Sequence, residues 1–245
     1  MIIIKTDKEI EAMREPCAIV RDALLLAEEK IKAGMTTMEL NNIIEDYIVK
    51  SGAKPSFKGL YGFPAASCIS IDEQIVHGFP SDRRIKEGEI VSVDIGAFKN
   101  GFHGDAARSL YVGDISPEKA KLIRVTRECF FEGIKGICIG SALGDIGSQV
   151  QRHAEENGFS VVREMVGHGV GRHLHEDPNV PNYGVAGTGI RLKRNMTIAI
   201  EPMINMGTKD VILEGWKCET KDGLPSAHYE NTVVITDDGV EILTL

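Results

Sequence analysis

The first stretch of the chain carries apolar residues at helical spacing behind a capping signature. Thr6 and Glu9, three positions apart, have the residue types of a capping box. The apolar positions that follow are Ile10, Met13, Val20, Leu24 and Ile31. Pro16 falls inside this stretch and predicts a kink or a restart. We therefore predict a helix that begins directly after Thr6.

A second stretch repeats the same pattern. Thr36 and Glu39 have capping-box spacing, and Gly52 is a typical stop signal. Between them lies an apolar stripe made by Leu40, Ile44 and Ile48. From about residue 68 to residue 112 the pattern changes to the β-rich runs "SCISI", "QIVHGF", "EIVSVDIGAF" and "GFHGDAARSLYV". Asn100-Gly101 predicts a turn between the last two runs, which are then antiparallel.

The second part of the chain has the same order of elements. Ser116-Pro117 predicts the start of a helix that reaches about Gly136, and another helix runs from about Leu143 to Asn157. Strand-like runs follow at "FSVV", "NMTIAIEPMI" and "AHYENTVVIT". At an offset of 106 residues, Leu40, Ile44, Ile48 and Gly52 align with Ile146, Val150, Ala154 and Gly158. We interpret this as a degenerate duplication.

The duplication predicts the overall class of fold. Two helix-helix-sheet halves, about 1–113 and 114–245, with no linker between them, indicate a single α+β domain over residues 1–245. We expect helices to cover one face of a curved antiparallel sheet. A site between the halves is then plausible.

Composition and charge narrow the functional classes. The chain has 245 residues, of which 42% are apolar, and a net charge of −8, which disfavours a nucleic-acid channel. Its apolar runs are too short to cross a bilayer, and "MIIIKTDKEIE" lacks the features of a signal peptide, so we expect a cytoplasmic protein without membrane contact. The five cysteines include no Cys-x-x-Cys pair, which argues against disulfides and structural zinc.

Acidic residues in apolar runs supply the candidate chemistry. Asp94 and Asp105 lie on either side of the Asn100-Gly101 turn and can face each other on paired strands. Glu201 and Glu230 lie in two further runs that read as buried sheet. Buried acids repel each other unless a cation lies between them. Four carboxylates can hold two divalent ions, and a bridged pair of ions would activate water for hydrolysis.

Histidines are concentrated in one segment. "GHGVGRHLHEDP" contains His168, His173 and His175, whereas the whole chain has seven histidines. Imidazole is the commonest metal ligand, although such a cluster can also be a solvated loop. Oxygen-rich ligation with one imidazole suits Mn, Fe(II), Co or Zn.

In that order and with these neighbours, Asp94, Asp105, His168, Glu201 and Glu230 resemble the five metal ligands of methionine aminopeptidases. The similarity also covers "DKEIEAMREPCAIVRDAL", "VHGFP", "GHGVGRHLHEDP", "IAIEPM" and "SAHYENTVVIT". It implies the pita-bread fold with pseudo-twofold halves, in the short bacterial type 1 form. It further implies two divalent ions: Asp94 would chelate one, Asp105 and Glu230 would bridge both, and His168 with Glu201 would complete the other.

The resemblance also implies roles outside the ligand set. Glu201 would act as the base for the attacking water, His77 would contact the scissile amide nitrogen, and His175 would contact the developing oxyanion. His173, His103 and His153 receive no such role. By position, the methionine side chain would be held by apolar walls, chiefly Phe63, Cys68 and Trp216, with Phe57, Leu60 and Leu174 beside them.

The implied activity is removal of the initiator methionine when the second residue is small. The implied partners are N-termini of nascent polypeptides at the ribosome, and the implied active form is a monomer. The chain departs from many bacterial relatives at Ala106-Ala107, where a hydroxyl residue often follows the second Asp, and at His228, where glutamine is common. These departures bear on local hydrogen bonding near Asp105 and Glu230.

Three alternatives remain. Xaa-Pro aminopeptidases and prolidases share the five ligands but usually carry an N-terminal domain, which this length leaves no room for. A binding protein on the same fold would not need all five ligands and both histidines. A two-metal phosphoesterase would need a phosphate-binding loop or a basic cluster beside the acids, and the sequence has neither.

Overall fold

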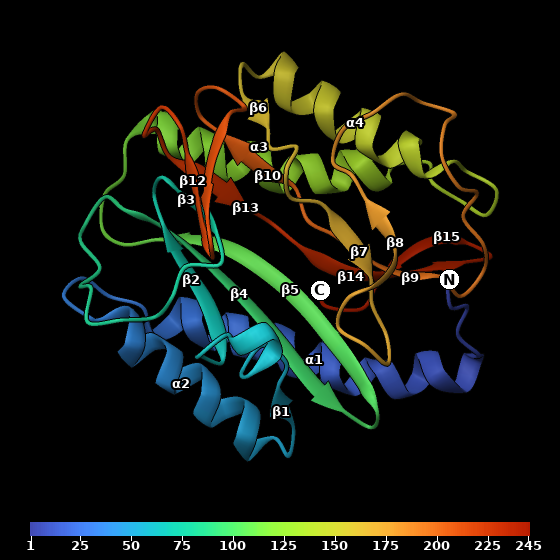
Figure 1. Cartoon of the computed structure of the whole chain (residues 1–245), viewed down its shortest axis with the longest axis horizontal. Coiled ribbons are helices and arrows are strands. Elements are labelled where there is room, and N and C mark those ends of the chain that lie inside the picture. Colours follow the sequence, from blue (N-terminus) through green and yellow to red (C-terminus); the bar gives the residue numbers. More distant parts are fainter.

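A computed structural model describes all residues, 1–245. Four α-helices lie in two pairs on either side of the strands (Figure 1). Their bounds are Asp7–Lys30 (α1), Thr37–Lys50 (α2), Pro117–Ile134 (α3) and Leu143–Glu156 (α4), and a short 3₁₀ helix, η1, spans Leu60–Gly62. No helix is long and apolar enough to span a bilayer.

The helix ends follow the signals in the sequence. Both predicted capping boxes form, with the hydroxyls of Thr6 and Thr36 accepting from the backbone N–H groups of Glu9 and Glu39. Pro16 lies inside α1 on its buried face, and the helix continues through it, so the predicted restart is wrong. The packing of that face holds the helix together where Pro16 removes one backbone donor.

The strands form four small antiparallel sheets. The first contains β1 (Lys54–Pro55), β2 (Ser67–Ile71), β4 (Ile90–Lys99) and β5 (Phe102–Tyr111). The second contains β6 (Ser160–Val161), β10 (Met203–Asn205) and β13 (Ser226–His228), and the third contains β3 (Gln74–Val76), β11 (Val211–Glu214) and β12 (Lys217–Thr220). The fourth contains β7 (Gly167–Gly169), β8 (Glu176–Val180), β9 (Thr197–Ile200), β14 (Asn231–Thr236) and β15 (Gly239–Ile242).

The longest strand pair is the predicted hairpin. In β4 and β5 every residue from Ile90 to Lys99 has a partner, and the Asn100-Gly101 turn has a positive φ at both residues. The sequence patterns do not predict β1, β7, β8, β11, β12 or β15. These strands have two to five residues each, too few for a clear alternation of apolar and polar positions.

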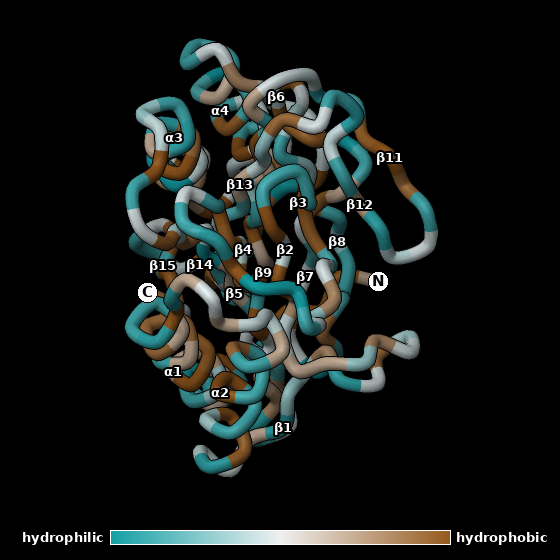
Figure 2. The backbone as a smooth tube through the Cα atoms, turned by 90° about the vertical axis from the view of Figure 1, so that its left-hand side faces the viewer, coloured by the Kyte–Doolittle hydropathy of each residue, from teal (hydrophilic) through white to brown (hydrophobic).

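Two large apolar clusters form the core, one under each helix pair. α1 and α2 pack on β2, β4 and β5, and α3 and α4 pack on strands of the second part of the chain (Figure 2). The residues that align at the 106-residue offset, Leu40, Ile44, Ile48, Ile146, Val150 and Ala154, are all fully buried. Elements from both parts of the chain also meet, because β3 pairs with β12 and α1 contributes to a third cluster with Val234.

The two parts are joined along β5 and the segment from His228 to Thr232. Ala107 and Glu230 exchange two backbone hydrogen bonds, at 3.3 and 3.0 Å. On one side of this pair the Thr232 hydroxyl accepts from the N–H and donates to the C=O of Asp105. On the other side the Ser109 hydroxyl does the same for His228. This seam places Asp105 next to Glu230.

Candidate metal centre and apolar cleft

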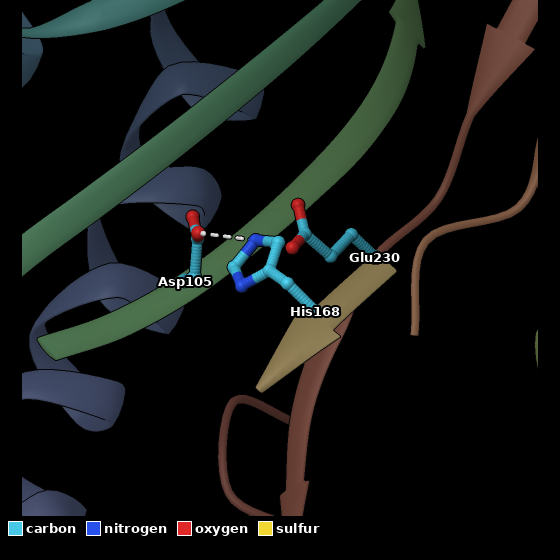
Figure 3. A group of neighbouring side chains, drawn as sticks. All are labelled: Asp105, His168 and Glu230. Atoms are coloured by element: carbon cyan, nitrogen blue, oxygen red, sulfur yellow. Dashed lines mark ion pairs between the residues drawn. The ribbon is translucent and has the colours of Figure 1, made fainter. Parts of the chain in front are cut away.

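Three side chains from distant parts of the chain converge beside the seam. Asp105 projects from β5, His168 from β7 and Glu230 from the segment before β14 (Figure 3). One ligand atom from each lies within 4.8 Å of the others, and His168 Nε2 lies 3.7 Å from Asp105 Oδ2. This spacing is suited to a shared cation.

The two other predicted ligands lie at the same place. Asp94 on β4 pairs with Ala107, and Asp105 pairs with Gly96, so the two aspartates share a face of the hairpin but are offset by two residues. They are therefore diagonal neighbours. The prediction that they face each other directly is wrong by this two-residue offset. Glu201 Oε1 lies 3.7 Å from His168 Nε2. The structure thus brings all five residues together.

The local structure at Glu201 and Glu230 differs from the prediction. Each was expected inside a strand, but Glu201 follows the end of β9 and Glu230 lies between β13 and β14. Both runs are interrupted at the acid, at Glu201-Pro202 and at Tyr229-Glu230. A strand break lets a side chain leave the alternation of the pleat, so both carboxylates can turn toward the hairpin.

Burial changes the proton affinity of these acids. It raises the pKa of Asp94 to about 7 and the pKa of Asp105, Glu201 and Glu230 well above their usual range. Neighbouring carboxylates add to the rise at Asp105, Glu201 and Glu230. Carboxylates gathered in this way would hold protons near neutral pH unless a cation lies among them.

The donor set fits a divalent ion. Asp94 Oδ1 and Asp105 Oδ1 are buried and have no hydrogen-bond partner. Burying a carboxylate oxygen in this way costs free energy unless another group, such as a cation, binds it. His168 Nδ1 lies 2.8 Å from the Gly169 carbonyl, which orients the ring so that Nε2 faces the carboxylates. Burial lowers the pKa of His168 to about 4, which keeps the imidazole neutral and able to coordinate.

Two further histidines flank the cluster. The His175 ring lies 4.5 Å from the His168 ring and stacks on Tyr61 at 6.2 Å. His77 has a positive φ of 60° and meets the Trp216 ring edge-on at 5.7 Å. Burial lowers the pKa of both His77 and His175. Both imidazoles are therefore neutral near pH 7 and can donate one hydrogen bond each.

A cleft of about 360 Å³ opens from the cluster. The four acids and the one histidine of the cluster line this cleft, and so do His77 and His175. The six predicted apolar residues also line it: Phe57, Leu60, Phe63, Cys68, Leu174 and Trp216. Phe63 meets Trp216 edge-on at 5.4 Å. The cleft therefore combines a carboxylate end with an apolar end, which is typical of small-ligand sites.

Several cleft residues are not predicted from the sequence. Tyr61, Met165, Val166 and Asn179 also line the cleft, and no motif distinguishes them from ordinary loop or core residues. Val76 lines it too and belongs to the "VHGFP" segment, which gave a role only to His77. His228 lies behind the cluster, with Nε2 at 3.8 Å from Glu201 Oε2 and 3.9 Å from Glu230 Oε2.

The remaining histidines lie outside the cleft. His173 is exposed, His103 Nδ1 lies 2.8 Å from the Ser56 hydroxyl, and His153 Nε2 lies 3.1 Å from Glu128.

A duplicated arrangement of helix pairs on antiparallel sheets, with a buried cluster of four acids and one imidazole, defines a metal-dependent hydrolase of the pita-bread fold. The sequence model of metallopeptidase family M24 matches residues 11–237. This match covers most of the chain, which belongs to metallopeptidase family M24.

Relatives within the family are similar over the full length. The chain is 53% identical to a methionine aminopeptidase of Clostridium perfringens, over 100% of the chain and 99% of the relative. A crystal structure of methionine aminopeptidase from Thermotoga maritima superposes with a TM-score of 0.97 at 45% identity, covering 100% of this chain and 99% of that one. Prolidase from Pyrococcus furiosus superposes with a TM-score of 0.82 at 28% identity, covering 99% of this chain and 65% of that one.

Proposed function

We propose that the chain is an aminopeptidase that removes the initiator methionine of polypeptides whose second residue is small. The observation that carries the proposal is full-length similarity to methionine aminopeptidases, at 53% identity to the Clostridium perfringens protein. The cleft supports it, because an apolar pocket for one side chain opens directly onto the carboxylate cluster.

The proposed cofactor is a pair of divalent ions. Asp94, Asp105, His168, Glu201 and Glu230 would hold the ions. The unpartnered carboxylate oxygens of Asp94 and Asp105 support these assignments. Co, Mn, Fe(II) and Zn all accept this donor set. Such ions supply Lewis acidity that makes water nucleophilic near neutral pH.

The side chains around the cluster would perform the proton transfers. Glu201 is proposed as the base that accepts a proton from the attacking water, because its carboxylate lies in the cluster, 3.7 Å from His168 Nε2, where that water would be bound. Asn182 Nδ2 donates to the Glu201 carbonyl at 2.9 Å and fixes the backbone there. Neutral His175 would donate to the developing oxyanion, and His77 would contact the departing amide nitrogen.

The apolar end of the cleft would recognise methionine. Phe63, Cys68 and Trp216 are proposed to contact the flexible thioether side chain, for which sulfur-aromatic contacts are favourable. A second residue larger than the space beside the cluster would overpack the site. Overpacking costs about 1 to 3 kcal/mol, which corresponds to roughly 10- to 200-fold slower cleavage.

Peptide cleavage tests this proposal. With added Mn(II), Met-Ala-Ser and Met-Gly-Ser should be cleaved after methionine, whereas Met-Leu-Ser, Leu-Ala-Ser and N-acetylated Met-Ala-Ser should be slow. Comparable turnover of the last three peptides would contradict the proposed specificity. Preferred cleavage of a Gly-Pro peptide would favour an Xaa-Pro peptidase. Hydrolysis of a phosphate ester, with no cleavage of any peptide, would exclude both kinds of peptidase.

The cellular setting is also a proposal. The substrates would be the N-termini of nascent chains, met at the ribosome in the cytoplasm, and the active form would be a monomer. Co-sedimentation with translating ribosomes and equilibrium sedimentation of the purified protein test these points. A stable dimer, or no binding to ribosomes, would contradict them.

A further inference from the structure

The loop that carries His175 is fastened to the N-terminal segment by a buried ion pair. Lys5 Nζ lies 2.6 Å from Glu176 Oε2, and only 1% and 2% of the two side chains are exposed. Lys5 precedes α1, whereas Glu176 is the first residue of β8, far along the chain (Figure 1). Removing one partner of a buried pair leaves an uncompensated charge, so each side chain requires the other.

The same carboxylate shapes the backbone around His175. Glu176 Oε1 accepts a hydrogen bond of 3.1 Å from the N–H of His173, and the His173 carbonyl accepts from the N–H of Gly171 at 3.0 Å. Residues 173–176 are thereby closed into a turn in which His175 lies between the two bonded residues. The Glu176 side chain therefore contributes to the orientation of the His175 main chain, together with the pairing of Glu176 with Gly169 in β8 and β7.

The absence of a side chain at Gly171 leaves room for the ion pair of Lys5 and Glu176. A Cβ atom on this residue would lie 2.4 Å from Lys5 Cε, 2.7 Å from Lys5 Nζ and 2.8 Å from Glu176 Oε1. The space that a side chain would take is filled by the ion pair. The loop thus contains a glycine where the pair needs room.

We propose that Lys5 and Glu176 form a positioning pair that holds the His175 imidazole at the cluster for catalysis. Neither residue lines the cleft, so the pair lies outside the pocket proposed for the methionine side chain and the scissile bond. Their effect reaches the reaction through the turn, whose His175 ring lies 4.5 Å from that of His168. The inference rests on the proposed function, because it assigns His175 to the reacting groups.

The first test removes one charge. Lys5→Met should lower kcat for Met-Ala-Ser by about 10- to 100-fold, less than the roughly 10²- to 10³-fold loss for deleting an oxyanion donor. KM and bound metal should stay within about twofold of wild type, since the pocket and the ligands are untouched. The matched control is Lys8→Met, an exposed lysine in the first turn of α1, which should match wild type.

Two further variants separate positioning from general damage. The double variant Lys5→Met/Glu176→Gln removes both charges but keeps an oxygen that can accept from His173, so kcat should recover toward wild type. Gly171→Ala keeps both charges and should lower kcat by displacing the pair. If Lys5→Met does not fold, kcat of the double variant and of Gly171→Ala is compared with that of wild type. A double variant as slow as the single one would overturn the proposal.

A readout independent of turnover follows the imidazole itself. In protein labelled at its seven histidines, the His175 NMR signal is identified as the one lost in His175→Ala. In Lys5→Met this signal should shift and broaden, while the His153 signal stays in place. An unmoved His175 signal, or loss of metal from Lys5→Met, would overturn the inference even if wild type cleaves no methionine peptide, a result that would refute only the proposed function.

Discussion

Lowering the pH from 8 to 6 should weaken divalent-metal binding, because the carboxylates of the metal-free site hold protons that an ion must displace. Burial raises the pKa of Asp94 to about 7. A group with that pKa is about 90% protonated at pH 6 and about 10% protonated at pH 8. Its titration alone therefore weakens the apparent affinity by about tenfold over this range.

The other candidate ligands also affect how metal affinity changes with pH. The pKa of Asp105, Glu201 and Glu230 is also raised, so these groups add to the proton release and make the pH dependence steeper than one carboxylate allows. The pKa of His168 is lowered to about 4, so this ligand is neutral throughout the range and contributes no proton. The change in affinity for the whole site should therefore exceed the roughly tenfold effect of Asp94 alone.

Calorimetric titration with Mn(II) measures the affinity of the site for the ion and the number of protons that binding releases. Titrations at pH 6, 7 and 8, each in two buffers with different ionisation enthalpies, give the affinity and the number of protons released. At pH 6 at least about one proton should leave with the first ion. The control is Asp46→Asn, an exposed acid on α2, which should leave the curve unchanged. An affinity that is constant between pH 6 and 8, with no proton release, would refute this account of the cluster.

Three further predictions concern the site and its support. Asp105→Ala should abolish turnover and lose bound metal, measured by elemental analysis; a variant with normal metal content would disprove its role as a ligand. His175→Ala should lower kcat by about 10²- to 10³-fold with metal intact, and metal loss would instead make His175 a ligand. Asn41→Ala should lower the free energy of unfolding by about 2 to 4 kcal/mol in urea titrations, because Asn41 Oδ1 accepts from Ala66 N and Ser67 N, which would be left buried without a partner. Asn42→Ala, its exposed neighbour, is the control, and equal losses would contradict this reasoning.

Local signals in the sequence were sufficient for the helices and the central hairpin. The capping boxes at Thr6 and Thr36 and the Asn100-Gly101 turn depend on residues a few positions apart, so nothing distant is needed to recognise them. The pairing of β4 with β5 follows from that turn, and it brings Asp94 and Asp105 to one face. Half of the carboxylate cluster was therefore predictable from one hairpin.

The other half of the cluster depended on contacts between distant residues. The apolar runs around Glu201 and Glu230 predict continuous strands, although Pro202, directly after Glu201, is itself a local strand-breaking signal. The breaks at these acids are stabilised from elsewhere in the chain, by Asn182 bonding the Glu201 carbonyl and by Ala107 pairing with the Glu230 backbone. Such partners cannot be identified from the hydropathy of the run itself.

What the sequence determined by itself is the set of local elements and, through its resemblance to methionine aminopeptidases, the identity of the candidate ligands. What only the tertiary structure decided is their arrangement: the approach of His168 and Glu201 to the hairpin, the place of Tyr61 on the cleft wall, and the buried contact of Lys5 with Glu176. The physical reason is the range of the interactions. Capping and turns are fixed by neighbours along the chain, whereas the cleft and its buried charges form only when segments more than a hundred residues apart exclude water together.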